Sequence, residues 1–200
     1  MHTAFILPLY PLENTVLLPG ERVALGGAEL TRPIIDRARG FGGAVVASLV
    51  DGESVHEVGV TAVVSGEEGG EACLHGVCRC RLLALVSDEV TLVRAERFPE
   101  PARNVRRAAA VTRLLLARYE RLCQRTGRTP VRPPSRSDLS AVTWRITAEV
   151  GLSTEQQQGF LNVPDPLTRG RLLLLAVREV ERRERILRRW AHLRSAEPWN

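Results

Sequence analysis

The stretch "ACLHGVCRCRLLALV" (residues 72–86) holds three of the chain's four cysteines and one of its four histidines. Either these side chains bind a metal ion, or the stretch is a β-strand that contains sulfur. A zinc site needs four convergent ligands, usually from paired C-x2-4-C motifs, whereas the spacing here is C-x4-C-x-C with no second cluster elsewhere. In an extended segment Cys73 and Cys80 would lie ~23 Å apart, at about 3.3 Å per residue. The stretch therefore predicts a strand and no metal site.

The alternation of residue types within this strand predicts which side chains are buried. Cys78 and Cys80 share one face and Arg79 and Arg81 share the other, and a bulge at Gly76 would change the alternation before them. Free cysteine behaves as a small buried hydrophobe. We therefore expect a core-facing cysteine face and a solvent-facing arginine face. A redox or regulatory thiol stays open as an alternative.

The rest of residues 1–99 is rich in short β-type runs separated by turns. An apolar run, the turn Pro19-Gly20 and a strand precede one short helix within "ELTRPIIDRARG" (residues 29–40). Further strands are indicated by the β-branched or alternating segments "AVVASLV" (44–50), "VGVTAVV" (58–64) and "EVTLVRAERF" (89–98). One helix among about six closely spaced strands predicts a small barrel or sandwich.

The segment "PEPAR" (residues 99–103) ends this pattern, and the remainder of the chain has helical periodicity. "STEQ" (153–156) is a capping box that begins a short helix. Asp165-Pro166 supplies the N-cap and the first-turn proline of a long final helix. We therefore expect a β-domain over residues 1–99, an α-helical bundle over residues 104–200, and the α+β fold class.

The composition excludes several kinds of enzyme. All 28 basic residues are arginine, so the chain has no lysine for a P-loop, a Schiff base or a Ser-Lys dyad. The four histidines are scattered, and neither H-E-x-x-H nor G-x-S-x-G occurs. We expect no enzyme, no catalytic residues and no cofactor.

The charge is divided unequally along the chain. Residues 1–100 carry 8 Arg and 14 acidic residues, which gives a net charge of −6. Residues 101–200 carry 20 Arg and 9 acidic residues, which gives a net charge of +11. The basic half could contact RNA, but its arginines alternate with glutamates and aromatic residues are only 4% of the chain, which disfavours a nucleic-acid surface. The Arg-rich end of the last helix is either a solvated helix end or a helix that meets a partner.

The N-terminus carries no targeting signal that we recognise. "MHTAFILPLYPLENTVLL" (residues 1–18) lacks a basic segment, and Pro8 and Pro11 interrupt its apolar run. We therefore expect neither a signal peptide nor contact with a membrane, and a cytoplasmic location.

Several segments resemble the N-terminal, substrate-binding domain of Lon proteases. "LPLYPLENTVLLPGERVAL" (7–25) is similar to the opening of that domain, where a Leu-Pro-Leu-x-Pro-Leu segment leads to a Pro-Gly turn and a strand. "VGVTAVV" and "HGVCRCRLL" (75–83) resemble its Val-Gly-x-x-Ala and Gly-x-x-Arg strands, and "QGFLNVPDPLTR" (158–169) its Gln-x-x-Leu and Asp-x-x-x-Arg spacings. The motif positions, to which we assign a structural role, are Pro8, Pro11, Pro19, Gly20, Glu29, Gly59, Gly76, Arg79, Gln158, Asp165 and Arg169.

The chain departs from the family pattern in three respects. Glu29 is followed by Leu30-Thr31-Arg32, where stand-alone members often carry Glu-Pro-Arg-Tyr, and Gly170 replaces an expected leucine. No segment resembles the ATPase or peptidase parts of a Lon protease. We therefore expect a stand-alone form of the domain.

The resemblance implies a PUA-like small β-barrel with one short helix, followed by an α-helical bundle that ends in a long helix. It implies a non-catalytic, ATP-independent role: binding unfolded or degron-bearing polypeptide, as an adaptor or regulator of proteolysis, with a protease or another protein as a further partner. The expected contact residues lie where the first strands meet the helices: Tyr10, Leu12, Val16, Leu17 and Leu18. Two alternatives stay open, namely that these five residues are plain core and that the protein is an RNA-binding PUA-like module.

Overall fold

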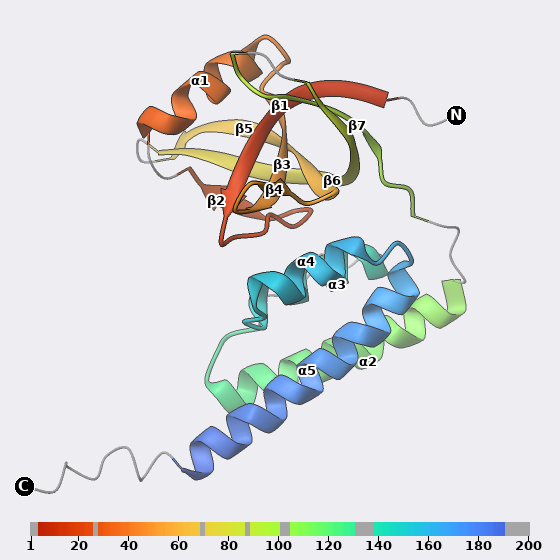
Figure 1. Cartoon of the computed structure of the whole chain (residues 1–200). Coiled ribbons are helices and arrows are strands. Elements are labelled where there is room, and N and C mark those ends of the chain that lie inside the picture. The colour runs from red at the N-terminus through yellow and green to blue at the C-terminus, as the bar shows by residue number, and fades with distance from the viewer. Residues whose placement is uncertain are drawn as a thin grey trace, which may run out of the picture. The chain divides into compact units, whose positions relative to one another are not determined.

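The computed structural model describes residues 4–25, 28–68, 71–86, 89–100, 105–130 and 138–190. The chain forms two compact units, which we call the β unit and the helical unit (Figure 1). The β unit comprises Met1–Pro101 together with Gly151–Pro164, and the helical unit comprises Ala102–Val150 together with Asp165–Asn200. The chain therefore enters the helical unit, returns to the β unit and leaves it again.

The β unit is built from strands of very unequal length. The longest, β6, corresponds to the cysteine-rich stretch, and every segment for which the sequence predicted a strand contains one. The elements are β1 (Ala4–Glu13), β2 (Arg22–Ala24), α1 (Ala28–Arg39), β3 (Ala44–Asp51), β4 (Ser54–Val55), β5 (Val58–Glu68), β6 (Glu71–Val86), β7 (Leu92–Arg97) and α4 (Thr154–Asn162).

The strand pairings close the sheet on itself. β1 pairs antiparallel with β7 through its first half and parallel with β3 through its second half. β7, β6, β5 and β3 are then joined in that order by antiparallel pairings. Because β1 pairs with both ends of this series, five strands form a ring, as a small barrel requires. With the helices added, this confirms the α+β fold class.

The inside of the ring is an apolar core. Its buried centre comprises Leu9, Val46, Cys80, Val93 and Ala95, and Phe5, Leu7, Val55 and Leu82 pack against it. The prediction that Cys80 faces the core is confirmed, since the residue is fully buried. Cys78 is only half-buried.

The prediction that Arg79 and Arg81 both face solvent is wrong for Arg79. Arg81 is exposed, but Arg79 is only 3% exposed because α4 covers this part of the outer surface of β6. The strand also bulges, since Thr61 pairs with Cys78 while Ala62 pairs with Gly76, which leaves Val77 without a partner in the register. Alternation along a strand shows which side chains share a face, but it cannot show that a helix covers that face.

Gly76 is required because the backbone of another segment crosses over it. A Cβ at this position would lie 2.4 Å from the carbonyl oxygen of Leu18 and 3.2 Å from Cγ of Leu17. Gly59 is similar, since a Cβ there would lie 2.6 Å from the carbonyl oxygen of Ala47. Each of these two family-motif glycines thus allows a neighbouring backbone segment to approach its strand closely.

The helical unit contains α2 (Val105–Thr126), α3 (Leu139–Glu149) and α5 (Pro166–Arg189). α3 begins at Asp138, whose carboxylate accepts from the Ala141 N–H, and α5 begins at the predicted N-cap Asp165. Gly170, where the family pattern has leucine, packs against α2 and α3, and a Cβ there would lie 2.9 Å from Val111 Cγ1. The close packing explains why a larger residue is absent.

The predicted domain boundaries differ from this division in one respect. The sequence placed everything after residue 104 in the helical domain, whereas Gly151–Pro164, including α4, packs within the β unit. The predicted capping box at Ser153 is present, with the Gln156 N–H donating to Ser153 Oγ and the Ser153 N–H to Gln156 Oε1. The helix was therefore correctly located along the chain but assigned to the wrong unit.

Within the described ranges, no helix is long and apolar enough to cross a membrane.

Candidate functional site

The five residues predicted to contact a polypeptide are buried. Tyr10, Leu12, Val16, Leu17 and Leu18 are 5, 7, 3, 2 and 0% exposed. Burial raises the pKa of the Tyr10 hydroxyl, and its hydrogen bond with Thr31 partly opposes this effect. These side chains pack inside the β unit and do not form an accessible surface in this conformation.

The family motif at residues 7–25 forms most of β1 and the turn that leads to β2. Pro8 is buried in β1, Pro11 is exposed, and Pro19 and Gly20 form the turn that leads to β2. Gly20 has a φ of 83°, which favours glycine, and its N–H donates to the Gly76 carbonyl at 2.8 Å. Glu29 lies in α1, and its side chain is outside the part of the chain that the structure describes.

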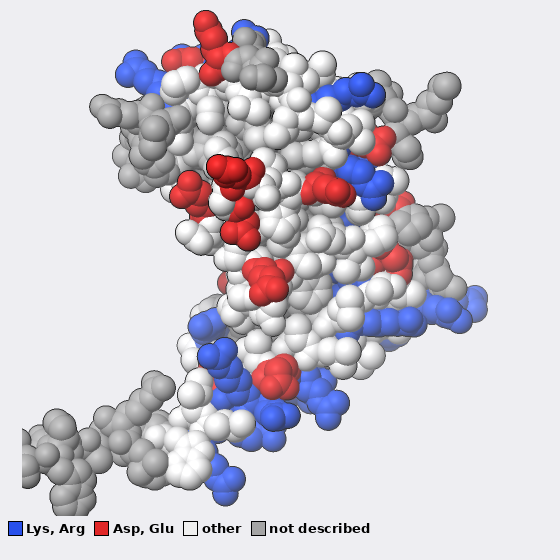
Figure 2. All heavy atoms as spheres, viewed as in Figure 1, with Lys and Arg blue, Asp and Glu red and all other residues white. Residues whose placement is uncertain are grey.

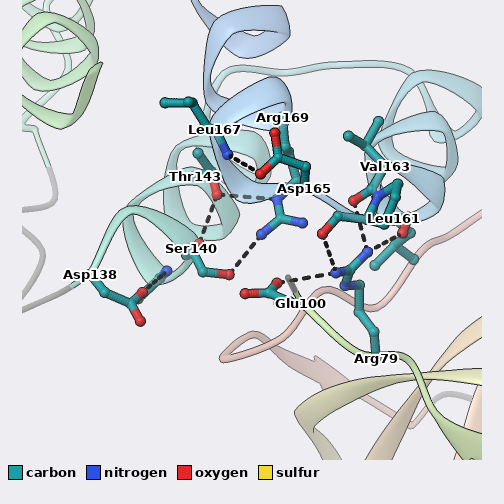
Figure 3. Close-up of polar contacts among 12 residues, drawn as sticks. Arg79, Glu100, Asp138, Ser140, Thr143, Leu161, Val163, Asp165, Leu167 and Arg169 are labelled. Atoms are coloured by element: carbon teal, nitrogen blue, oxygen red, sulfur yellow. Dashed lines mark hydrogen bonds and ion pairs between the residues drawn. The ribbon is translucent and has the colours of Figure 1, made fainter. Parts of the chain in front are cut away.

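Arg79 joins β6 to the end of α4 (Figure 3). Its Nη1 donates to the carbonyl oxygens of Leu161 at 2.8 Å and Val163 at 2.9 Å, and its Nη2 donates to that of Pro164 at 3.2 Å and to the Glu100 carboxylate at 3.1 Å. The last carbonyls of a helix lack partners within the helix and carry partial negative charge. The buried guanidinium satisfies them, so it fixes the C-terminal end of α4 on the β unit.

Two further contacts attach α4 to the strands and loops of the β unit. Nε2 of the buried Gln158 donates to the Val58 carbonyl at 2.8 Å, at the start of β5. Oγ1 of Thr154 donates to the carbonyl of Asn14 at 2.9 Å. Arg79 and Gln158, both family-motif residues, therefore have a structural role in this unit.

Arg169 has an equivalent role inside the helical unit (Figure 3). It is fully buried, donates to Ser140 Oγ at 2.7 Å and to Thr143 Oγ1 at 3.3 Å, and lies 3.8 Å from the centre of the Trp144 ring. Asp165, one turn earlier, accepts from the N–H groups of Leu167 and Thr168. Its hydrogen bonds, chiefly from the Thr168 hydroxyl, lower the pKa of the Asp165 carboxyl.

None of these motif residues is arranged as a general acid, base or nucleophile. Arg79 and Arg169 donate mainly to carbonyls and hydroxyls, and Cys80 is a core residue whose pKa burial raises to about 12, with a smaller contribution from Cys78. Among the described residues, no three His, Cys, Asp or Glu side chains are grouped closely enough to hold a metal ion. The contacts that Arg79 and Arg169 make are therefore structural hydrogen bonds.

An exposed apolar surface lies on the outer side of β1, β7 and β6. The register places Ile6, Arg94 and Ala84 side by side in one row, and Pro8, Leu92 and Val86 in the next row of the same face. The rows that alternate with these two point into the core, where Val93 and Ala95 are fully buried. We call Ile6, Ala84, Val86, Leu92 and Arg94 the outer β face.

Two further leucines of β6 are exposed but are not part of the outer β face: Leu83 lies at the bulge, and Leu85 pairs with Val93, in a row that points the other way. Ile6 and Val86 are 46% and 40% exposed, and Leu83 and Leu85 are 43% and 55% exposed. Sequence analysis missed this surface. The signal was the uninterrupted run Leu82–Val86, because a strand with one solvated face should alternate apolar and polar residues.

The two units differ strongly in charge. Over all residues of each unit, the β unit has 8 Arg and 15 acidic residues, a net charge of −7, and the helical unit has 20 and 8, a net charge of +12. Figure 2 shows many arginines on the visible surface of the helical unit. Glu181, one of these 8 acidic residues, is buried and accepts from Arg118 Nε at 3.1 Å.

One sequence profile identifies the family of this chain, and solved structures share its fold. The sequence profile described as the ATP-dependent protease La (LON) substrate-binding domain matches residues 6–179. A search of curated protein sequences finds no significant match. Among solved structures, the N-terminal domain of the Mycobacterium avium complex Lon protease superposes with a TM-score of 0.68 at 21% identity, covering 86% of this chain and 98% of that one. A Lon N-terminal domain protein from Xanthomonas campestris gives a TM-score of 0.62 at 21% identity, with the same coverage.

Proposed function

Because the chain belongs to the family of Lon substrate-binding domains, we propose that it binds unfolded or degron-bearing polypeptides and acts as an adaptor or regulator of proteolysis. The observation that carries the proposal is the family match over residues 6–179, which is to the substrate-binding part of these proteases and not to their ATPase or protease parts. The role we propose for this chain is to hold a polypeptide, without cutting it or consuming ATP.

The exposed apolar residues of the β unit support this role. Recognition of unfolded chains depends on apolar side chains that folded proteins bury, so the receptor needs an accessible apolar surface of its own. The outer β face and Leu83 and Leu85 supply such a surface among the described residues. Exposing them without a partner would be a liability for solubility.

Binding of an unfolded model protein tests the proposal. A reduced, carboxymethylated and fluorescently labelled protein should bind the full chain at micromolar concentration, as measured by fluorescence anisotropy, whereas the same protein in its folded state should not. The bound protein should remain intact on a gel after prolonged incubation, with or without ATP. No binding at tens of micromolar, or cleavage of the probe, would contradict the proposal.

The charge of the helical unit favours RNA binding as a second candidate. A net charge of +12 on this unit would attract a polyanion, and such binding weakens steeply with salt. We expect RNA to bind weakly and without sequence preference, as a consequence of charge alone. Tight binding to one RNA among several of equal length at 150 mM salt would instead make RNA the ligand.

A further inference from the structure

One edge of β6 is left unpaired at its C-terminal end. The pairing of β6 with β5 ends where Val58 faces Arg81, and one more hydrogen bond follows, from the Leu82 N–H to the Glu57 carbonyl at 2.8 Å. On its other side, β6 continues to pair with β7 as far as Val86 and Leu92. Within the described parts of the chain, no strand pairs with the free side of residues 83–86.

Apart from its short length and one bulge, this edge lacks the features that usually protect an edge strand. Natural edges are blunted by charged side chains, by prolines or by a covering helix or loop. Residues 83–86 are Leu, Ala, Leu and Val, all four are exposed, and a bulge places Leu83 outside the register with β7. The bulge twists the strand locally, but Ala84, Leu85 and Val86 continue in regular pairing beyond it.

One positive charge lies on the outer β face close to this edge. Arg94 is exposed, and the register places it between Ile6 on β1 and Ala84 on β6. It forms no ion pair with any residue that the structure describes. The acidic residue two positions along the same face, Glu96, stands opposite Arg81 in the register.

The small side chain of Ala84 leaves a path from Arg94 to the edge. Neighbouring strands are about 4.8 Å apart, so a strand added beside β6 would lie about 10 Å from β7. An extended arginine side chain and the carboxylate of a glutamate on the added strand can meet across that distance, above the methyl group of Ala84. The surface is therefore complementary to an extended apolar segment that carries an acidic side chain at the position facing Ala84.

We propose that the free edge of β6 at residues 83–86 binds an extended, largely apolar polypeptide segment as an additional strand, with an acidic side chain of that segment paired to Arg94. The inference rests on the proposed polypeptide-binding function and names its site and the class of segment recognised. In such strand addition, main-chain hydrogen bonds supply affinity for many sequences, and side chains on alternate positions supply selectivity. This combination suits a protein that must accept varied unfolded chains.

Three fluorescent nine-residue peptides test the proposal by anisotropy. All alternate threonine and valine; one has a central glutamate, one a central lysine, and the third has the central glutamate with every other residue N-methylated. The wild-type chain should bind the glutamate peptide about threefold more tightly than the lysine peptide, as expected for one exposed ion pair. N-methylation should weaken binding about tenfold or more, because it removes the main-chain donors.

Substitutions in the protein separate this site from other surfaces. Arg94→Glu should reverse the preference between the glutamate and lysine peptides, while Arg32→Glu, the same charge change at an exposed position of α1, should leave it unaltered. Val86→Ser should weaken the binding of both the glutamate and the lysine peptide. Circular dichroism should show all three variants folded, because each changed side chain is exposed.

The outcomes distinguish this inference from the broader function. If the unfolded model protein binds but the peptides respond neither to N-methylation nor to Arg94→Glu, polypeptide binding stands and the β6 site is wrong. If neither the unfolded protein nor any peptide binds, both proposals fail. If the protein alone self-associates with increasing concentration and Val86→Ser abolishes this, a second copy occupies the edge and the peptide proposal is overturned.

Discussion

Arg79 shows how much a single residue can contribute to this fold. Burying a guanidinium is costly unless its donors are satisfied, and here three carbonyls and one carboxylate accept from it. The carbonyls come from residues more than 80 positions later in the chain, at the end of α4. The Phe98 ring, whose centre lies 4.6 Å from the guanidinium carbon, completes its surroundings.

We predict that Arg79→Met destabilises the protein by about 3 kcal/mol, because it leaves helix-terminal carbonyls and a carboxylate without their donor. Urea unfolding followed by circular dichroism measures the change. Arg81→Met is the matched control, since Arg81 also lies near the Phe98 ring but is exposed, and it should cost less than about 0.5 kcal/mol. Equal effects of the two substitutions would refute a special role for Arg79.

Cys80 should make stability depend on alkaline pH. Its pKa is about 12 in the folded state, against a usual value of 9.0, because burial disfavours the thiolate. Below pH 9 both states keep the proton and stability is unaffected. Between pH 9 and 12 only the unfolded state loses it, so the free energy of unfolding should fall by up to about 1.4 kcal/mol per pH unit.

Urea unfolding at pH 8, 9, 10 and 11 checks this prediction. Cys80→Ala should remove most of the fall between pH 9 and 10, while Cys73→Ala, at a half-buried position, should retain it. Tyr10, whose pKa burial also raises, adds to the fall above pH 10 in every variant. A wild-type profile that stays flat from pH 8 to 10 would contradict the burial of the Cys80 thiol.

Among the elements, α4 is specified by two kinds of interaction: local signals set its ends, and distant residues set its position in the fold. Its ends are specified locally, by the capping box at Ser153 and by Pro164 and Pro166 after its last residues. Its place in the fold depends on distant partners, which are Asn14, Val58 and Arg79. The helix is therefore predictable as a helix, but its packing site is not predictable from its own residues.

Two glycines allow the packing of such elements to be tested with the same substitution. Gly76→Ala on β6 would place a Cβ 2.4 Å from a backbone oxygen, so we expect a loss of about 3 kcal/mol or failure to fold. Gly159→Ala in α4 meets nothing within 4 Å and improves helix propensity, so we expect a gain of about 0.5–1 kcal/mol. Thermal unfolding of both variants measures the effects, and destabilisation by Gly159→Ala would show that α4 is more tightly packed.

At the scale of the whole molecule, the order of the chain and the division into units do not coincide. Residues 1–101 form most of the β unit, but its α4 arrives only after two helices of the other unit have been made. The chain therefore cannot be divided at one point into two complete parts. The opposite net charges of the two units, −7 and +12, follow the same division.

We predict that residues 1–101 expressed alone do not fold stably, because the buried Arg79 and the start of β5 lose the partners that α4 supplies. A chain that joins residues 1–101 to residues 151–164 through a flexible Gly/Ser linker should fold. Cooperative thermal unfolding and dispersed amide resonances report folding in each case. A stable, cooperative fold of residues 1–101 would show that α4 is dispensable.

The amino-acid sequence alone was enough to predict the kinds of element, their order and the family. Strand and helix periodicity, the Pro-Gly turn and the caps at Ser153 and Asp165 act over a few residues, so they are visible in the chain. The family motifs are visible for the same reason, whereas the close packing at Gly59 and Gly76 became evident only from the tertiary structure.

Which faces are covered and which remain open depends on the tertiary structure. Arg79 is buried by a helix more than 80 residues away, and the five residues expected at a binding surface, Tyr10 and Leu18 among them, are core. One side of the exposed run at residues 83–86 is open because β5 begins at Val58 and no described strand pairs with that side. Burial depends on contacts between residues far apart in the chain, and a local pattern carries no information about which distant segment will supply them.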